Sequence, residues 1–218
     1  MDAKRFLVIG MGSFGSVLVT ELLKMNRAVT AVDEDRNHLT KFPKHANLDA
    51  IIADATDRDF LESLDVKQYR AVMLSTGEDS HSSILITMHL RELGAERIIV
   101  KANTRDHARI LEKVGATETV IPEQQMAAKL AKSISQPNLV DFLPLSEDLV
   151  VAEIKTPESF VGKHLSEVRL RSDYHVQAIA VKRNSGTLVF VPGGDFAIHE
   201  GDLLVVVGSE SDLNRLRS

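Results

Sequence analysis

The chain has 218 residues, a length that fits one large domain or two of modest size. It contains no cysteine, which excludes disulfides, thiolate nucleophiles and thiolate metal sites. The net charge of −5, with both signs interspersed, argues against a general nucleic-acid binder, and no apolar run approaches the roughly 18 residues of a membrane span. We therefore expect a soluble, cytoplasmic protein that does not bind nucleic acid.

The first element in the chain is an apolar run that leads into a glycine-rich turn. Residues 6–9 predict a buried strand, and Gly10, Gly12 and Gly15 then form a G-x-G-x-x-G pattern ahead of a helix over 16–25. In such motifs the first glycine permits a tight turn, the second lets a phosphate approach the backbone, and the third allows the helix to pack closely on the strand. The helix N-terminus would then offer free N–H groups to an anion.

A carboxylate ends the second predicted strand, which covers residues 28–32. Asp33 lies roughly 20 residues past the glycines, where Rossmann folds place the acid that binds ribose hydroxyls. Because this carboxylate should repel a 2′-phosphate, the pattern favours adenosine, ADP, ATP or NAD over NADP. The less favoured alternative is a structural turn followed by an incidental acid.

Strands and helices continue to alternate as far as residue 121. Further strands are predicted over 48–53, 71–76, 97–102 and 118–121, and helices over 34–42, 57–64, 79–93 and 105–114. Asp57 and Thr104 are expected to cap their helices. On the helix over 79–93 the residues expected to be buried are Ile84, Leu85, Met88 and Leu93. This order predicts an α/β fold, a Rossmann-like doubly wound parallel sheet with ligand groups at the carboxyl ends of the strands.

Those strand ends carry glycines, acids, hydroxyls and one lysine, but no nucleophile with an evident base: Gly10 to Gly15, Asp33, Asp54, Ala55, Thr56, Ser75, Thr76, Gly77, Lys101, Asn103, Pro122 and Glu123. We therefore expect a binding site without catalytic residues. The histidines add no metal-ligand spacing, and five are expected at the surface, namely His38, His45, His81, His89 and His107.

A helix is predicted over 123–135, with an apolar stripe that the sheet does not need: Met126, Ala127, Leu130, Ala131 and Ile134. We expect it to cross to a partner subunit, the alternative being that it packs on its own domain. Beyond it, short strands over 149–154, 175–182, 187–191 and 202–208 and short helices over 165–170 and 211–216 indicate a small α+β domain that would dimerise. The predicted domains are 1–135, including the crossover helix, and 136–218.

Several motifs together resemble the RCK (TrkA-N/TrkA-C) family. In the first domain they are residues 10–15, 33, 54–56, 101–103, 111–116 and 121–123, and in the second domain residues 161–165, 178–181 and 198–202. Their order and spacing are similar to those of the regulatory subunits of Ktr/Trk-type bacterial potassium uptake systems.

The resemblance implies a cytosolic ring, a homo-octamer built as a tetramer of dimers, docked on the inner face of the cell membrane beneath a subunit that translocates potassium. It also implies that bound nucleotide changes the shape of the ring. ATP activates and ADP inactivates the Ktr type, while some Trk-type relatives bind NAD or NADH.

The resemblance further assigns roles to individual residues. The glycines would hold phosphates, Asp33 the ribose, Asp54 and Ala55 the adenine, and Glu123 a divalent cation such as Mg²⁺ shared across the dimer. The complete set of candidate nucleotide contacts is Gly10, Gly12, Ser13, Phe14, Gly15, Asp33, Asp54, Ala55, Thr56, Thr76, Gly77, Lys101, Asn103 and Glu123.

Two features of this comparison leave the ligand open. ATP-responsive members usually carry arginine where this chain has Ser13, and serine supplies neither the charge nor the planar fork of that arginine. Some relatives bind cyclic di-AMP in the second domain, and Arg169, Ala178 and Pro192 lie in the matching region.

Two other functions are compatible with parts of the sequence. An NAD-dependent oxidoreductase would show the same glycine motif and Asp33, but the second domain lacks a clear catalytic set. A nucleotide-sensing transcription regulator is disfavoured because the sequence shows no helix-turn-helix with a basic recognition helix.

Overall fold

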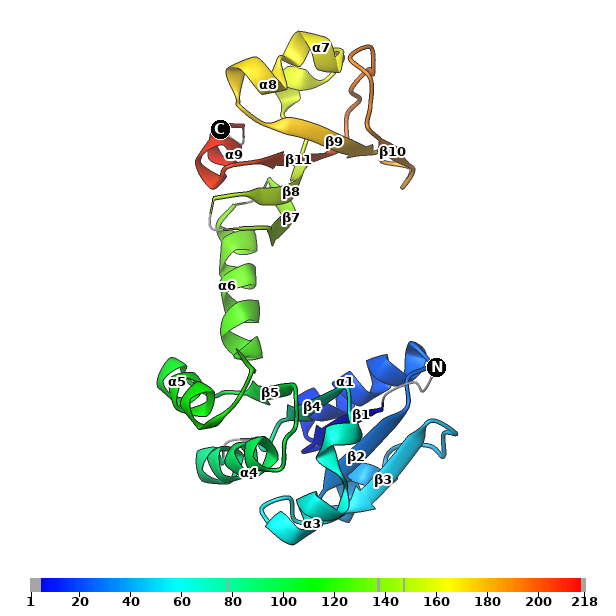
Figure 1. Ribbon diagram of the computed structural model, residues 1–218. Coiled ribbons are helices and arrows are strands. Elements are labelled where there is room, and N and C mark those ends of the chain that lie inside the picture. Colours follow the sequence, from blue (N-terminus) through cyan, green and yellow to red (C-terminus); the bar gives the residue numbers. More distant parts are fainter. Residues whose placement is uncertain (1–4, 78, 137, 147, 217–218) are drawn as a thin grey trace. The chain divides into compact units, whose positions relative to one another are not determined.

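The computed structural model describes residues 5–77, 79–136, 138–146 and 148–216, and the chain divides into two compact units, residues 1–125 and 126–218 (Figure 1). Each unit is described by itself. Helix α6 (Pro122–Ser135) spans the division, and the proposed domain boundary after Ser135 stays a prediction. Within the described ranges, no helix has the length and apolar character needed to cross a membrane.

The first unit contains a six-stranded parallel sheet in the order β3-β2-β1-β4-β5-β6. Its strands are β1 (Phe6–Ile9), β2 (Val29–Asp33), β3 (Leu48–Ile52), β4 (Ala71–Leu74), β5 (Ile98–Lys101) and β6 (Glu118–Val120). Strand β1 lies in the middle of the sheet. Strands β2 and β3 are added on one side of it, and β4, β5 and β6 are added on the other. The strand order therefore reverses between β1 and β4, and this switch point is where doubly wound sheets bind ligands.

Helices cover both faces of this sheet: α1 (Ser13–Lys24), α2 (Arg36–Thr40), α3 (Arg58–Ser63), α4 (Ser80–Glu92) and α5 (Arg105–Val114). Alternate residues of β1 point to opposite faces, as in any strand. Leu7 and Ile9 join a core with buried residues of α3, α4 and α5, whereas Val8 joins a separate core with α1 and α2. The predicted doubly wound α/β fold is confirmed.

The prediction of which residues α4 buries holds only in part: Ile84 and Leu93 are partly buried against the core. The buried residues of this helix are Ser83, Ile86, Thr87 and Leu90, while Met88 is 37% exposed. Ser83 and Thr87 tolerate burial because each hydroxyl donates to a backbone carbonyl one turn earlier, at 2.9 and 2.6 Å. A pattern of apolar residues alone could not reveal a buried face that includes two hydroxyl groups.

His107 was expected at the surface, yet it is only 6% exposed, between α4 and α5. The backbone N–H of Asn103 donates to His107 Nδ1 (3.3 Å), so Nε2 carries the hydrogen and contacts Ser83 Oγ at 2.9 Å. Burial lowers the pKa of His107 below its ordinary value of 6.5, which favours this neutral form.

The second unit contains a five-stranded antiparallel sheet in the order β10-β9-β11-β8-β7. The strands are β7 (Leu139–Pro144), β8 (Val150–Lys155), β9 (Gln177–Lys182), β10 (Leu188–Phe190) and β11 (Leu203–Gly208). Its short helices are α7 (Leu165–Val168), α8 (Leu170–Asp173) and α9 (Glu210–Leu216). This arrangement confirms the predicted small α+β domain.

The structure differs from the elements predicted for the second unit in two places. Strand β7 was not predicted, because it is an edge strand in which only Leu139 is buried and which ends at a proline. The single helix expected over 165–170 is two helices, since Arg169 between them adopts a left-handed conformation with φ of 53°.

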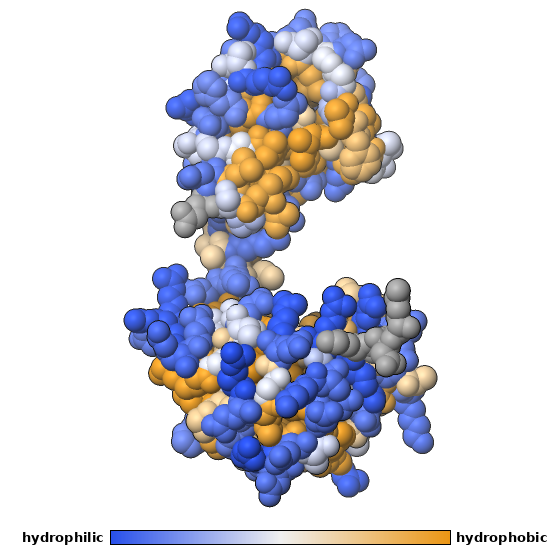
Figure 2. All heavy atoms as spheres, in the orientation of Figure 1, coloured by the Kyte–Doolittle hydropathy of each residue, from blue (hydrophilic) through white to orange (hydrophobic). Residues whose placement is uncertain are grey.

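Helix α6 buries none of its residues. Three side chains of its apolar stripe are well exposed: Met126 at 64%, Leu130 at 59% and Ile134 at 73%. Apolar side chains also gather on the visible face of the second unit, in orange in Figure 2. The largely exposed apolar residues of this unit include Leu143, Phe190 and Val191. Exposed apolar surface on this scale is typical of an association surface.

Candidate functional site

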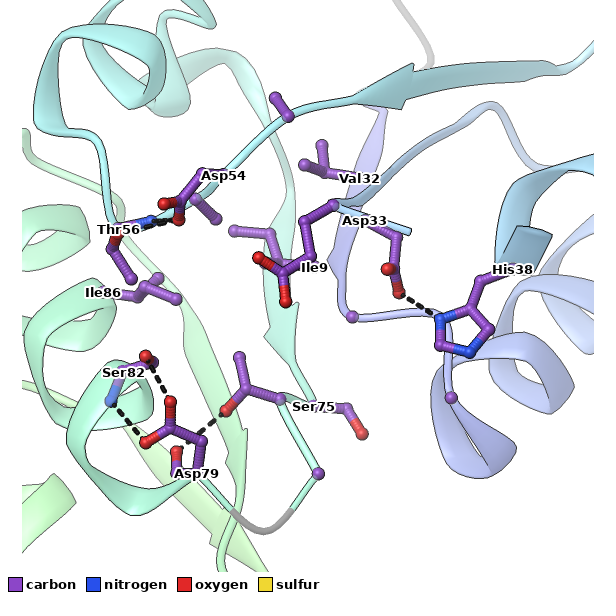
Figure 3. Close-up of a pocket in the computed structure, with 17 residues that line it drawn as sticks. Ile9, Val32, Asp33, His38, Asp54, Thr56, Ser75, Asp79, Ser82 and Ile86 are labelled. Carbon is purple, nitrogen blue, oxygen red and sulfur yellow. Dashed lines mark hydrogen bonds and ion pairs between the residues drawn. The ribbon is translucent and has the colours of Figure 1, made fainter. Parts of the chain in front are cut away.

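A cavity of about 250 Å³ lies at the carboxyl ends of the strands, at the switch point of the first unit (Figure 3). Loops that follow β1, β2, β3 and β4 supply its walls. Among the candidate contacts, those that line it are Gly10, Gly12, Asp33, Asp54, Ala55, Thr56, Thr76 and Gly77. The topology thus brings residues from four separate loops to one place.

The three loop glycines occupy different environments. A Cβ on Gly10 would lie 2.1 Å from the carbonyl oxygen of Ser75, and a Cβ on Gly15 would lie 1.9 Å from that of Gly10. The protein's own packing therefore requires both glycines. A Cβ on Gly12 would meet no protein atom within 4 Å, so the space beside this residue is open to a ligand.

The start of α1 differs from the starts of the other helices of this unit. Side chains of Asp35, Asp57, Asp79 and Thr104 cap α2, α3, α4 and α5, respectively. The N-cap of α1 is Gly12, which has no side chain to accept a hydrogen bond. Its first N–H groups are therefore available to an external anion, at the positive end of a helix of 12 residues.

Asp33 at the end of β2 is bound to the glycine loop. Its carboxylate accepts hydrogen bonds from the backbone N–H groups of Met11 (2.5 Å) and Asp35 (2.8 Å). The ring of His38 contacts the same carboxylate, with 3.1 Å between Nδ1 and Oδ2. These contacts hold a 9% exposed carboxylate at the cavity wall, where a ribose hydroxyl can donate to it.

Two further carboxylates face the cavity from other loops. The Thr56 hydroxyl and N–H donate to Asp54 (2.7 and 2.8 Å) and lower its pKa. The Ser82 hydroxyl, at 2.6 Å, and its N–H group do the same for the pKa of Asp79. Both carboxylates are therefore ionised at neutral pH and can accept hydrogen bonds from a ligand. Adenosine suits such walls because its ribose hydroxyls and exocyclic amine are hydrogen-bond donors.

The remaining candidates lie outside this cavity. Gly15 packs against Gly10, Phe14 is half-buried in the first turn of α1, and Ser13 lines a neighbouring cavity. Asn103 donates its N–H to the buried His107. Lys101 at the end of β5 pairs with Glu123 of α6, with 2.6 Å between Nζ and Oε1.

Glu123 is the candidate metal residue. It is 67% exposed, and its hydrogen bond from Lys101 lowers its pKa, so it is a carboxylate at neutral pH. The described ranges contain no group of three or more histidines and acids that could hold a metal. Magnesium at Glu123 would thus need oxygen ligands from elsewhere, which nucleotide phosphates and water commonly supply. A single carboxylate fits that role.

Four polar residues of the cavity were not among the candidates from the sequence: Glu34, His38, Asp79 and Ser82. Asp79 was predicted as the start of a helix, and its place at the end of the loop between β4 and α4 was the signal that it lies near the strand ends. His38 lies five residues beyond Asp33, after the turn that begins α2, and only the path of that turn shows that its ring returns to the carboxylate.

The second unit has a groove of about 580 Å³ beside α7, α8 and β9. It brings together Arg169, Ala178 and Pro192, which the sequence had grouped only by resemblance. Arg169 is exposed, and its Nε lies 3.6 Å from the carboxylate of Asp173.

A doubly wound sheet with a glycine loop at its switch point defines a Rossmann-type nucleotide-binding domain. Comparison with known protein families identifies the family within this class. The TrkA-N domain matches residues 6–122, and the TrkA-C domain matches residues 149–218. The chain belongs to the TrkA-N/TrkA-C family.

One relative is the Ktr system potassium uptake protein C of Bacillus subtilis (strain 168). It is 35% identical over 212 residues, which is 97% of this chain and 95% of the relative. The fold is similar to that of the GsuK RCK domain, with a TM-score of 0.66 and 21% identity over 100% of this chain and 48% of that one. It is also similar to the GsuK channel bound to NAD, with a TM-score of 0.54 and 19% identity over 99% and 38% of the two chains. This chain therefore corresponds to about half or less of either solved chain.

Proposed function

We propose that this chain is the nucleotide-sensing regulatory subunit of a potassium uptake system. It binds an adenine nucleotide in the first unit and passes its binding state to a membrane subunit that translocates potassium. The observation that carries the nucleotide site is the uncapped start of α1, with open space beside Gly12 and the carboxylate of Asp33 within the same cavity. The potassium uptake assignment is supported by a relative that matches nearly the full chain.

In this proposal the ribose binds Asp33, the adenine lies beside Asp54 and Ala55, and phosphates bind the backbone from Gly12 to Gly15. The ligand is ATP or ADP, or alternatively NAD(H). The solved GsuK channel bound to NAD supports the second choice, because its fold is similar. Lys101 would then bind a phosphate group in place of Glu123, and Glu123 would bind a magnesium ion.

We infer a binding role and not an enzymatic one. Within the described chain the ring nitrogens of His38 contact only the carboxylates of Asp33 and Asp35, and no hydroxyl is bonded to either nitrogen. The cavity therefore offers no nucleophile with a base. The second candidate function is an NAD-dependent oxidoreductase, which shares the glycine loop and Asp33.

The assembly we propose is a homo-octameric ring, a tetramer of dimers, at the inner face of the cell membrane. The exposed stripe on α6 supports association. Nucleotide would act by population shift, favouring the ring geometry that it binds more tightly. A factor of 100 in affinity between two geometries supplies about 2.7 kcal/mol per site.

The groove of the second unit suggests a further ligand, cyclic di-AMP. The three residues expected for it line one groove, and Arg169 presents a guanidinium that can bind phosphate. Titration of the full chain with cyclic di-AMP tests this assignment. Binding that Arg169→Ala weakens about tenfold supports it, and equal binding by both proteins contradicts it.

The decisive test of the nucleotide site is calorimetric titration with ATP, ADP, NADH and NADPH, with and without magnesium. Asp33→Ala removes the ribose acceptor and should weaken every nucleotide by about tenfold or more. Asp49→Ala, on the exposed part of β3, makes the same charge change outside the cavity and serves as the control. Full affinity in Asp33→Ala would contradict the site, and steady turnover of an NAD-linked substrate would contradict the class.

The cation role is tested in the same experiment with Glu123→Gln. If Glu123 completes a magnesium site, the variant should weaken ATP binding only when magnesium is present. An equal loss without magnesium would show that Glu123 acts through its pairing with Lys101 instead.

A further inference from the structure

A second cavity of about 440 Å³ adjoins the candidate nucleotide cavity. The two share Gly12 and His38, so a ligand in the first cavity can extend directly into the second. The second cavity lies between α1 and the end of α2. Its lining consists of Met11, Gly12, Ser13, Ser16, Thr20, His38, Lys41, Phe42 and Pro43.

The charged side chains that line the two cavities differ in sign. Four acids line the first one and no lysine or arginine does: Asp33, Glu34, Asp54 and Asp79. No acid lines the second one, whose lining includes Lys41 and three hydroxyl side chains. This division matches a ligand whose donor-rich nucleoside occupies the first cavity and whose anionic group occupies the second.

Two polar groups of the second cavity have no partner within the described chain. Lys41 is exposed and forms no ion pair with any described residue, and the hydroxyl of Ser13 makes no hydrogen bond to one. The other hydroxyls, of Ser16 and Thr20, donate to backbone carbonyls at 3.2 and 2.9 Å. Lys41 and Ser13 are thus the donors available to a ligand here.

Asp33, whose carboxylate the sequence pattern places against a 2′-phosphate, does not line the second cavity. Its carboxylate already accepts two backbone N–H groups and contacts the His38 ring, which lies between it and the second cavity.

We propose that the second cavity is a subsite for an additional phosphate group on an adenine nucleotide bound in the first cavity, with Lys41 and Ser13 as its contacts. The inference rests on the proposed nucleotide site. Such a phosphate has two sources: the terminal phosphate of ATP, or the 2′-phosphate of NADPH. ADP and NADH are the matched ligands that lack it.

Calorimetry on the full chain tests the subsite with these four nucleotides. Lys41→Gln removes the charge while keeping a side chain of similar length. We expect it to weaken either ATP or NADPH by about tenfold, with ADP and NADH unchanged within about twofold. Ser13→Ala should weaken the same ligand by a smaller factor. Lys44→Gln makes the same charge change at an exposed lysine outside the cavity and is the control.

The pattern of losses identifies the source of the phosphate. A loss for ATP alone assigns the subsite to the terminal phosphate, and a loss for NADPH alone assigns it to the ribose phosphate. Equal losses for all four ligands, or equal effects of Lys41→Gln and Lys44→Gln, overturn the subsite while leaving the nucleotide site intact. If the wild-type chain binds none of the four, the proposed function fails and the subsite fails with it.

Discussion

The glycines that follow β1 belong to one motif, but different requirements make each of them a glycine. Gly10 and Gly15 are held by backbone atoms of the protein itself, whereas Gly12 faces open space beside the uncapped helix. Folding and ligand binding can therefore be separated by single substitutions in the same loop.

We predict opposite phenotypes for Gly15→Ala and Gly12→Ala. The first places a methyl group 1.9 Å from the Gly10 carbonyl oxygen, so it should destabilise the first unit by about 1–3 kcal/mol. The second meets no protein atom and should change the free energy of unfolding by less than about 1 kcal/mol, while weakening nucleotide binding at least tenfold.

Thermal unfolding of the ligand-free chain and calorimetric titration check the two halves of this prediction. Each variant is the control for the other. Normal nucleotide affinity in Gly12→Ala would mean that phosphate does not approach this part of the backbone.

At the scale of elements, every strand of the parallel sheet was predicted, because most are short apolar runs and they alternate regularly with helical segments. Strand β7 was missed because Asp141 interrupts its apolar residues and a proline ends it, as an exposed edge strand allows. The fully buried residues of α4 were missed because a partner helix determines them. His107 on α5 supplies the contact that lets Ser83 be buried.

The same contact makes the α4–α5 pairing sensitive to pH. The folded chain keeps His107 neutral because burial lowers its pKa, whereas in the unfolded chain it takes up a proton near pH 6.5. The unfolded state thus binds more protons below that pH. The stability that the neutral residue contributes is complete above about pH 7 and is lost progressively as the pH falls through 6.5.

We predict that His107→Gln, which cannot titrate, loses less stability than the wild type between pH 7.5 and pH 5.5. Chemical unfolding at several pH values measures this difference. His45→Gln removes an exposed histidine and should keep the pH dependence of the wild type. Parallel curves for wild type and His107→Gln would mean that the pKa of His107 is the same in the folded and the unfolded chain.

At the scale of the whole molecule, the sequence predicted the candidate site in part. Spacing within one motif located the glycines and Asp33, and the parallel topology implied that Asp54 and Thr76 would join them. Two kinds of information were beyond its reach. The pairing of Lys101 with Glu123 depends on side-chain positions, and the contrast in charge between adjacent cavities depends on how α2 ends beside α1.

The last prediction concerns the stripe on α6, whose residues the described chain leaves exposed. If this stripe packs against a second copy, Ile134→Glu would bury a charge in the interface, which is strongly unfavourable without a partner. We expect the variant to form smaller assemblies than the wild type in sedimentation velocity experiments, while its circular dichroism spectrum stays the same. Ala128→Glu places an equal charge on the same helix outside the stripe and should keep the wild-type assembly. Unchanged assembly in both variants would mean that α6 does not form the subunit contact, and the exposed apolar residues of the second unit would then be the next surface to test.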